Sequence, residues 1–196
     1  MFPNIFMKAM GEAPPGEGRG GCLVGLVLCG GESRRMGRDK GLMLHDGVPW
    51  ALSAGRKLMP WMPVYYSIRQ AQREAYAAVL PAERLIVDTV DIGGPLNGLL
   101  SAHQRFPSAD ILLTACDMLH FDEVSLEKLL AAREAGEADF IAYGDERLWQ
   151  PFGCVYTSRG LRKASGHPSL QSLLRSGRTQ GLPVTDAAAF ANDNAL

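Results

Sequence analysis

An apolar run of strand length leads directly into a glycine- and arginine-rich loop in the segment Leu23-Val-Gly-Leu-Val-Leu-Cys-Gly-Gly-Glu-Ser-Arg-Arg-Met-Gly-Arg-Asp-Lys40. Residues 23–28 show no alternation with polar side chains. Such a run is typical of a strand buried on both faces of a parallel sheet. The residues that follow it would then lie at the carboxyl end of that strand, where open α/β sheets bind their ligands.

The same strand pattern recurs along the chain and alternates with helical patterns. Apolar runs of strand length occupy residues 23–28, 64–68, 85–87, 111–115, 140–143 and 152–156. Helical patterns occupy residues 49–59, 71–80, 96–106 and 123–135. This alternation predicts an α/β domain with a mostly parallel central sheet flanked by helices.

Shorter signals add detail to this outline. Residues 42–50 predict a small hairpin around an Asp-Gly turn. The helix at 123–135 has two candidate N-caps, Asp122 and Ser125, and ends before Gly136. The tail shows a helical pattern at 170–174 and a short apolar piece at 182–184.

The composition is that of an ordinary globular domain and excludes several classes of protein. The 196 residues include 20 Lys+Arg and 21 Asp+Glu, a formal net charge of −1, and 46% are hydrophobic. This balance provides no bulk attraction to nucleic acid or anionic lipid. No apolar run approaches the ~18–20 residues of a membrane-spanning helix. We therefore expect a cytoplasmic protein with neither nucleic-acid nor membrane partners.

The first twenty residues differ from the rest of the chain. They are rich in glycine and proline and lack the pattern of a secretory signal, so residues 1–20 are expected to form a flexible extension. Residues 21–196 are expected to form a single domain. No C-x-x-C pair occurs, which favours reduced, buried cysteines at Cys22, Cys29, Cys116 and Cys154.

The loop after the first strand has the chemistry of a polyphosphate cradle. Gly30 and Gly31 let backbone N–H groups approach an anion closely, and Ser33 adds a donor. Four basic side chains follow within eight residues: Arg34, Arg35, Arg38 and Lys40. A surface turn with solvated arginines is disfavoured because so many basic residues and glycines directly follow a buried strand.

The loop nevertheless departs from the common nucleotide motifs. Gly31 stands where a Walker A loop requires lysine, and the G-x-G-x-x-G fingerprint of dinucleotide-binding proteins is absent. Arg35 occupies the last position of a would-be hydrolase G-x-S-x-G. These departures argue against an NAD(P) oxidoreductase and against a serine hydrolase.

Two carboxylates follow other predicted strands, and position alone leaves the role of each open. Asp117 comes just after the strand at 111–115, where it could hold Mg²⁺ together with phosphate oxygens or could cap the next turn. Asp88 follows the strand at 85–87 and precedes a Gly-Gly-Pro turn. It could contact a base or ribose, or the loop could simply be held by its glycines and proline.

Together these features resemble one known family. Residues 28–40 are similar to the L-A-G-G-x-S-x-R-M-G-x-D-K signature of the molybdenum cofactor guanylyltransferases, which are MobA-like nucleotidyltransferases. Residues 88–98 resemble that family's D…G-P-L-x-G stretch, and residues 114–118 resemble its C-D-x-P strand end. Residues 190–194 are similar to its F-x-N-x-N-T-P run, although the chain stops at Leu196 without the Thr-Pro and the helix beyond it.

The resemblance implies a Rossmann-like nucleotidyltransferase fold with a mostly parallel, mixed sheet. It also implies transfer of GMP from GTP to the molybdopterin cofactor with release of pyrophosphate. The implied cofactor is Mg²⁺, held by Asp117, and the implied protein partners are molybdoenzymes or cofactor-handling proteins. The residues implied to bind the nucleotide are Leu28, Cys29, Gly30, Gly31, Ser33, Lys40, Ser67, Asp88 and Asp117.

The catalytic residues expected on this basis are Arg35, Lys40 and Asp117. The two cations would stabilise charge on the phosphates and on the leaving pyrophosphate. An anionic phosphate nucleophile needs no general base, in agreement with the scattered histidines. Two alternatives are a sibling enzyme that uses CTP or another phosphate acceptor, and a non-catalytic nucleotide-binding homologue. The Gly30-Gly31 pair favours the guanylyl branch.

Overall fold

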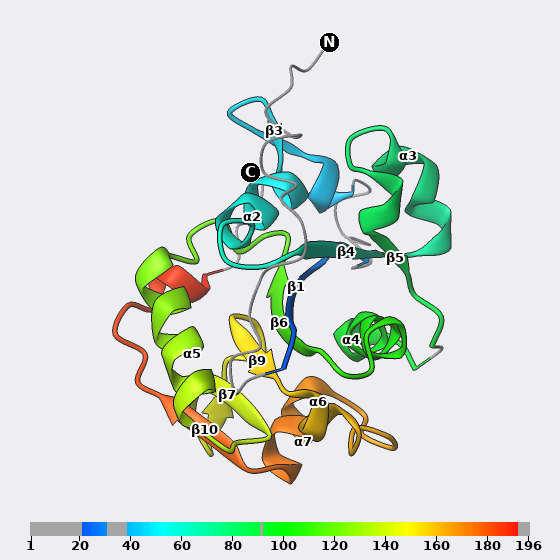
Figure 1. Ribbon diagram of the computed structural model, residues 1–196. Helices are drawn as coiled ribbons and strands as arrows, with labels where there is room; N and C mark the ends of the chain where they lie inside the picture. The colour runs from blue at the N-terminus through cyan, green and yellow to red at the C-terminus, as the bar shows by residue number, and fades with distance from the viewer. Residues whose placement is uncertain (1–20, 31–38, 91, 192–196) are drawn as a thin grey trace.

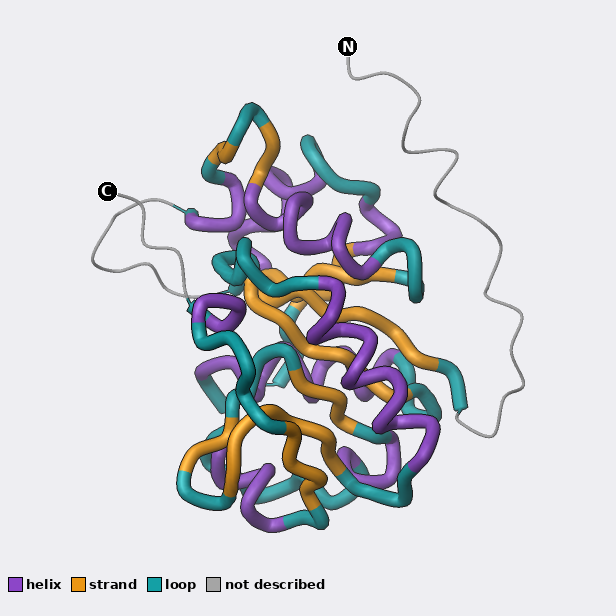
Figure 2. The backbone as a smooth tube through the Cα atoms, turned by 90° about the vertical axis from the view of Figure 1, so that its left-hand side faces the viewer, coloured by secondary structure: helices purple, strands orange, loops and turns teal. Residues whose placement is uncertain are grey.

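The computed structural model describes residues 21–30, 39–90 and 92–191. Its central sheet has the strand order β10-β7-β9-β6-β1-β4-β5. The strands are β1 (Leu23–Leu28), β4 (Val64–Ile68), β5 (Leu85–Val87), β6 (Asp110–Ala115), β7 (Phe140–Asp145), β9 (Cys154–Tyr156) and β10 (Thr179–Leu182). A short strand, β8 (Leu148–Trp149), pairs with β7 alone. The hairpin β2 (Leu44–His45) and β3 (Val48–Pro49) projects from one end of the molecule (Figure 2).

Helices cover both faces of the sheet (Figure 1). One apolar core lies between the sheet and α2 (Trp50–Leu58), α3 (Arg73–Ala77) and α5 (Glu123–Ala135). The second lies between the opposite face and α4 (Gly94–Arg105), α6 (Ser158–Leu161) and α7 (Leu170–Ser176). Neighbouring residues of the central strands therefore enter different cores, which explains why these strands are apolar throughout.

The sheet is mixed but mostly parallel, as predicted. Strands β6, β1, β4 and β5 run parallel to one another, and β10 runs parallel to β7. Strand β9 runs antiparallel to both of its neighbours, β6 and β7. Each carboxyl end in the parallel set therefore lies at the same edge of the sheet.

Most predicted elements are present, and several have the predicted bounds. Strands β1, β4 and β5 and helix α5 are confirmed residue for residue. The prediction of a strand from residue 152 was wrong by two residues, because Gly153 has a φ of +61° and β9 begins only after it. The last strand, β10, was not predicted, and it includes only the first residue of the apolar piece at 182–184. Strand β10 has a polar sequence and was missed in the search for apolar runs. An edge strand that is paired on one side needs little apolar character.

Other differences concern the cysteines and short helices. Cys29, Cys116 and Cys154 are free and buried as expected, but Cys22 is exposed because it precedes the first strand. Helix α4 begins at Gly94, two residues before its predicted start, and α6 was not predicted. In the part of the chain that the structure describes, no helix is both long and apolar enough to cross a bilayer.

Asp122 is the N-cap of α5. Its carboxylate accepts a hydrogen bond from the backbone N–H of Ser125 (2.6 Å), which resolves the choice between the two candidate caps. Asp122→Ala should lower the free energy of unfolding by about 1 kcal/mol, because a backbone donor of the first turn loses its acceptor. Urea denaturation measures the change. The exposed mid-helix variant Glu127→Ala serves as the control, and an equal loss there would contradict the capping role.

Candidate functional site

The candidate site lies at the carboxyl ends of the parallel strands. The chain leaves β1 for β4 and β5 on one side and returns to β6 on the other, so the strand order reverses at β1. Open α/β sheets bind ligands at such a switch point. Gly30, Ser67, Asp88 and Asp117 lie at or just beyond the ends of four adjacent strands.

Lys40 and Asp117 form an ion pair across this switch point. The Lys40 Nζ lies 3.0 Å from Asp117 Oδ2, although 77 positions separate the two residues. Their side chains are 21% and 16% exposed, so the pair is shielded but open on one side. Lys40 opens the 3-10 turn η1 (Lys40–Leu42), and Asp117 follows the end of β6. The structure thus joins two residues that the sequence assigned to phosphate and metal binding.

Asp88 and Ser67 form a second polar cluster beside Gly30. The Ser67 hydroxyl is buried and donates to Asp88 Oδ1 (2.7 Å). The other carboxylate oxygen lies 3.2 Å from the point that a Cβ on Gly30 would occupy. Glycine at position 30 therefore leaves room for the carboxylate at the end of β1.

The surroundings of Asp88 disfavour the charged form of its carboxylate. Burial raises the pKa of this carboxyl above its usual range, and the Ser67 hydroxyl and the Arg69 guanidinium only partly offset that effect. An acidic group held against desolvation at a ligand-binding edge is a candidate functional group.

The end of β1 is held from both sides by backbone hydrogen bonds. The Cys29 N–H donates to the Ser67 carbonyl of β4 (2.9 Å), and the Cys116 N–H donates to the Leu28 carbonyl (3.1 Å). The Cys29 side chain is buried in the core under α2 and α3. Burial raises the pKa of its thiol, so Cys29 presents backbone rather than a reactive thiolate at the site.

Several predicted site residues lie outside the described part of the chain. These are Gly31, Ser33 and Arg35, together with the rest of residues 31–38. Among the described members of the predicted set, Leu28, Cys29 and Gly30 lie at or just beyond the end of β1. The other four form two clusters at the switch point, Lys40 with Asp117 and Ser67 with Asp88.

Sequence reasoning missed residues that support these clusters from a distance. Lys57 of α2 donates to the backbone carbonyls of Leu119 and Phe121 (3.0 Å to the latter), in the loop after Asp117. Gly98 of α4 lies so close to Ser67 that a Cβ there would come within 2.2 Å of the hydroxyl oxygen. The G-P-L-x-G motif includes Gly98, but no local signal in the sequence identifies Lys57.

Asp117 has the right chemistry for a hard divalent cation. Among residues 21–30, 39–90 and 92–191, no three His, Cys, Asp or Glu side chains come together as a metal cluster. Mg²⁺ takes one or two protein carboxylates and completes its shell with phosphate oxygens and water. A single carboxylate, Asp117, beside the Lys40 ammonium fits that pattern.

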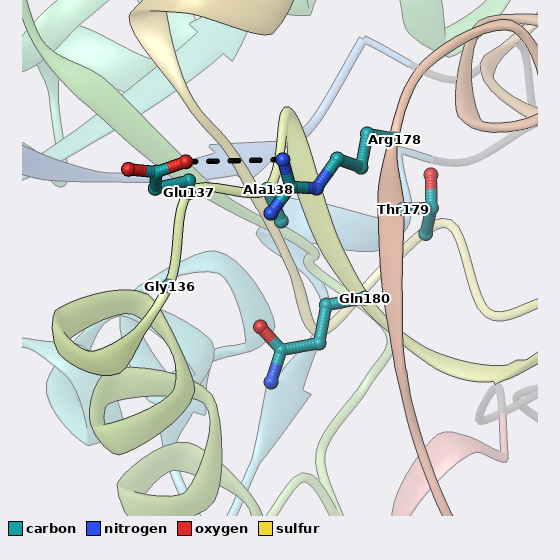
Figure 3. A pocket seen from close by; sticks show the side chains of 6 residues that line it. All are labelled: Gly136, Glu137, Ala138, Arg178, Thr179 and Gln180. Carbon is teal, nitrogen blue, oxygen red and sulfur yellow. Dashed lines mark ion pairs between the residues drawn. The ribbon is translucent and has the colours of Figure 1, made fainter.

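A hollow of about 270 Å³ lies at the amino ends of β7 and β10, away from the candidate site (Figure 3). It is lined by residues just before or at the start of β7 and β10. An ion pair between Glu137 and Arg178 (3.8 Å) crosses it, and both side chains are largely exposed. It contains none of the predicted site residues.

The fold and the site define an α/β protein in which a lysine and two carboxylates gather at the switch point of a mostly parallel sheet. The profile of the MobA-like NTP transferase domain matches residues 25–182. The chain belongs to this MobA-like NTP transferase family and is a nucleotidyltransferase.

Individual relatives agree with this assignment. A molybdenum cofactor guanylyltransferase of Pseudomonas putida is 32% identical over 82% of this chain and 86% of its own length. A molybdenum cofactor biosynthesis bifunctional protein of Synechocystis is 38% identical over 56% of this chain, but the match spans only 31% of that longer protein. The crystal structure of molybdopterin-guanine dinucleotide biosynthesis protein A from Archaeoglobus fulgidus has the same fold. Its TM-score is 0.72 at 22% identity, over 88% of this chain and 92% of that one.

The raised pKa of Asp88 makes a prediction about stability. An acid whose pKa is higher in the folded state destabilises the fold once pH rises through the interval between its unfolded and folded values. Asp88→Asn keeps an acceptor for Ser67 and removes the half-buried charge. We expect this variant to be more stable than the wild type at pH 7, with the difference vanishing toward pH 4.

Urea unfolding between pH 4 and pH 8 measures this difference. Glu127→Gln, on the exposed face of α5, is the control for removal of a carboxylate. A wild-type protein that is more stable than Asp88→Asn at pH 7 would show that the carboxylate is well compensated, contrary to this account.

Proposed function

We propose that this protein transfers GMP from GTP to the molybdopterin cofactor, releasing pyrophosphate and forming the guanine dinucleotide cofactor. The observation that carries the proposal is the Lys40–Asp117 pair at the switch point of a MobA-like fold. Relatives named molybdenum cofactor guanylyltransferase, at 30–36% identity over most of their length, support the choice of donor and acceptor.

The reaction requires charge stabilisation more than covalent chemistry. A terminal phosphate oxygen of the acceptor attacks the α-phosphorus of GTP, and the bond from that phosphorus to the bridging oxygen of pyrophosphate breaks. The nucleophile is already anionic, so no side chain has to remove a proton. Lys40 lies where its ammonium can bind phosphate oxygens and stabilise the leaving pyrophosphate.

Asp117 is the residue that would hold Mg²⁺. When bound, the cation would neutralise phosphate charge and align the reacting groups. The Lys40 ammonium contacts Asp117 Oδ2, so the two positive charges of the proposed site would lie side by side. Lys40 thereby keeps the carboxylate oriented toward the phosphate side of the site.

The second cluster is proposed to bind the nucleoside. Asp88 lies at the end of β5, three strands from β6 and beside Gly30, where its carboxylate can accept hydrogen bonds from a base or ribose. The Ser67 hydroxyl holds this carboxylate in position by donating a hydrogen bond to it. This arrangement supports a binding mode in which the triphosphate lies near Lys40 and the nucleoside lies on the β4–β5 side of the site.

Lys40→Ala should lower kcat for pyrophosphate release by ~10²–10³, the loss typical of one preorganised charge-stabilising donor. Turnover with GTP, Mg²⁺ and molybdopterin measures the change. Because the pair is partly exposed, the fold should survive, and thermal unfolding without ligand checks this.

Three controls make the result specific. Arg84→Ala removes a cation that stacks on the Tyr65 ring, away from the site, and should retain turnover. The wild-type melting temperature should rise with GTP and Mg²⁺, since a ligand at ~100 times its dissociation constant adds ~2.7 kcal/mol. A shift with CTP in place of GTP would indicate the cytidylyl reaction, and full turnover in Lys40→Ala would refute the assigned role.

A further inference from the structure

A buried hydrogen-bond network surrounds Asp39, the residue directly before Lys40. Asp39 Oδ1 accepts from the Gly41 N–H (3.0 Å) and from the Tyr76 hydroxyl (2.8 Å). Asp39 Oδ2 accepts from the side-chain amide of Gln72 (2.5 Å). Both oxygens of the carboxylate are therefore engaged, and one of them caps the turn that carries Lys40.

Gln72 joins this network to the end of β1. Its side chain is buried, and the same amide nitrogen that contacts Asp39 also donates to the Cys29 carbonyl (3.2 Å). Its amide oxygen accepts from the backbone N–H of Arg69 (2.8 Å). One side chain thus ties together residues 29 and 39, which lie on either side of residues 31–38.

Tyr76 supports the same turn by packing and by its hydroxyl. The side chain is fully buried, and a Cβ on Gly41 would come within 2.1 Å of its oxygen. Burial is the main cause that raises the pKa of this hydroxyl far above its usual range, so it stays protonated and donates to Asp39. The 3-10 turn η2 (Gln70–Gln72) and α3, which carry Gln72 and Tyr76, follow the carboxyl end of β4.

The hydrogen bonds to Asp39 bear on which carboxylate the Lys40 ammonium contacts, that of Asp39 or that of Asp117. A partly buried carboxylate that loses its donors must be solvated or must find a cation, and Lys40 is its immediate neighbour in the chain. With the donors in place, Asp39 is satisfied by Gln72, Tyr76 and Gly41, and the Lys40 ammonium reaches Asp117 instead.

We propose that Gln72 and Tyr76 are positioning residues for GTP, which hold Lys40 toward Asp117 by satisfying the carboxylate of Asp39 and anchoring it to the end of β1. This inference rests on the proposed function, since it assigns Lys40 to the phosphates of GTP. Each of the two side chains donates to Asp39 and acts on Lys40 through that carboxylate.

The decisive variant is Gln72→Glu, which keeps the shape of the side chain. The new carboxylate can still accept from the Arg69 N–H, but its second oxygen would face the Cys29 carbonyl and the Asp39 carboxylate. We expect kcat/KM for GTP to fall ~10²-fold, the effect of displacing a catalytic group by about 1 Å. The KM for molybdopterin should stay within twofold, because the proposed role of Lys40 concerns the phosphates of GTP.

A compensating substitution tests the mechanism directly. In Asp39→Asn/Gln72→Glu the donor and the acceptor exchange places, so residue 39 can again bond residue 72 while its oxygen still accepts from Gly41 and Tyr76. The double variant should recover at least tenfold in kcat/KM over Gln72→Glu alone. It should remain below the wild type, because the Cys29 carbonyl then lacks its donor.

Tyr76→Phe provides a milder, independent variant. It removes one donor to Asp39 and keeps the packing on Gly41, so we expect a three- to tenfold loss in kcat/KM for GTP. Tyr156→Phe is the matched control, since it removes a buried hydroxyl that donates to the Pro151 carbonyl (2.9 Å), and it should leave both KM values unchanged.

The outcomes separate this inference from the proposed function. A wild-type protein without GTP-dependent pyrophosphate release would refute the proposed function itself. With an active wild type, unchanged kcat/KM for GTP in Gln72→Glu and in Tyr76→Phe would refute the positioning role. Equal losses in the single and double variants would also refute it, because remaking the bond between residues 39 and 72 should return Lys40 to its position. If Gln72→Glu fails to fold, the comparison of Tyr76→Phe with Tyr156→Phe decides the question.

Discussion

The backbone pairing of β1 with β4 on one side and β6 on the other is the constraint on which the site depends. Leu28 is in register with Ser67 and with Ala115. This register places Gly30 beside the residues that end the neighbouring strands, and it brings Asp117 within reach of Lys40. A slip of one residue would turn every side chain of β1 to the opposite core. The packing of the two apolar cores therefore fixes the geometry of the polar site, although the cores contribute no charged group to it.

Asp139 and Asp88 lie at opposite ends of the strands, and they differ in how far hydrogen bonds and charges offset the desolvation of the carboxylate. At the edge away from the site, Asp139 is buried, which by itself raises the pKa of its carboxyl, yet bonds from Lys163, the Arg178 N–H and Arg159 lower that pKa overall. At the site edge, Asp88 has one hydroxyl donor and a more distant guanidinium, and burial prevails. The protein compensates the first carboxylate fully and leaves the second with capacity to accept hydrogen bonds. That difference is typical of a structural group and a ligand-binding group.

The sequence alone predicted the parallel strands and the charged residues at their ends, because both depend on local signals. Continuous apolar runs identify β1, β4 and β5, and short motifs identify Lys40, Asp88 and Asp117. The edge strand β10 was missed because its pairing partner, rather than its own residues, determines its conformation. Gln72 was missed for a related reason. It is one of two glutamines in a polar turn, and only the folded structure places it between residues 29 and 39.

The roles of Asp39 and Lys40 differ although they are adjacent and opposite in charge. In an isolated loop such neighbours would share the same solvent and partly screen each other. Here the carboxylate faces inward to three donors and the ammonium faces the switch point, so the pair is divided between the scaffold and the site. The separation depends on side chains from η2 and α3, which follow a different strand. The position of the Lys40 charge therefore depends on two neighbouring strand ends together, and substitutions beyond β4 can reach it through Asp39.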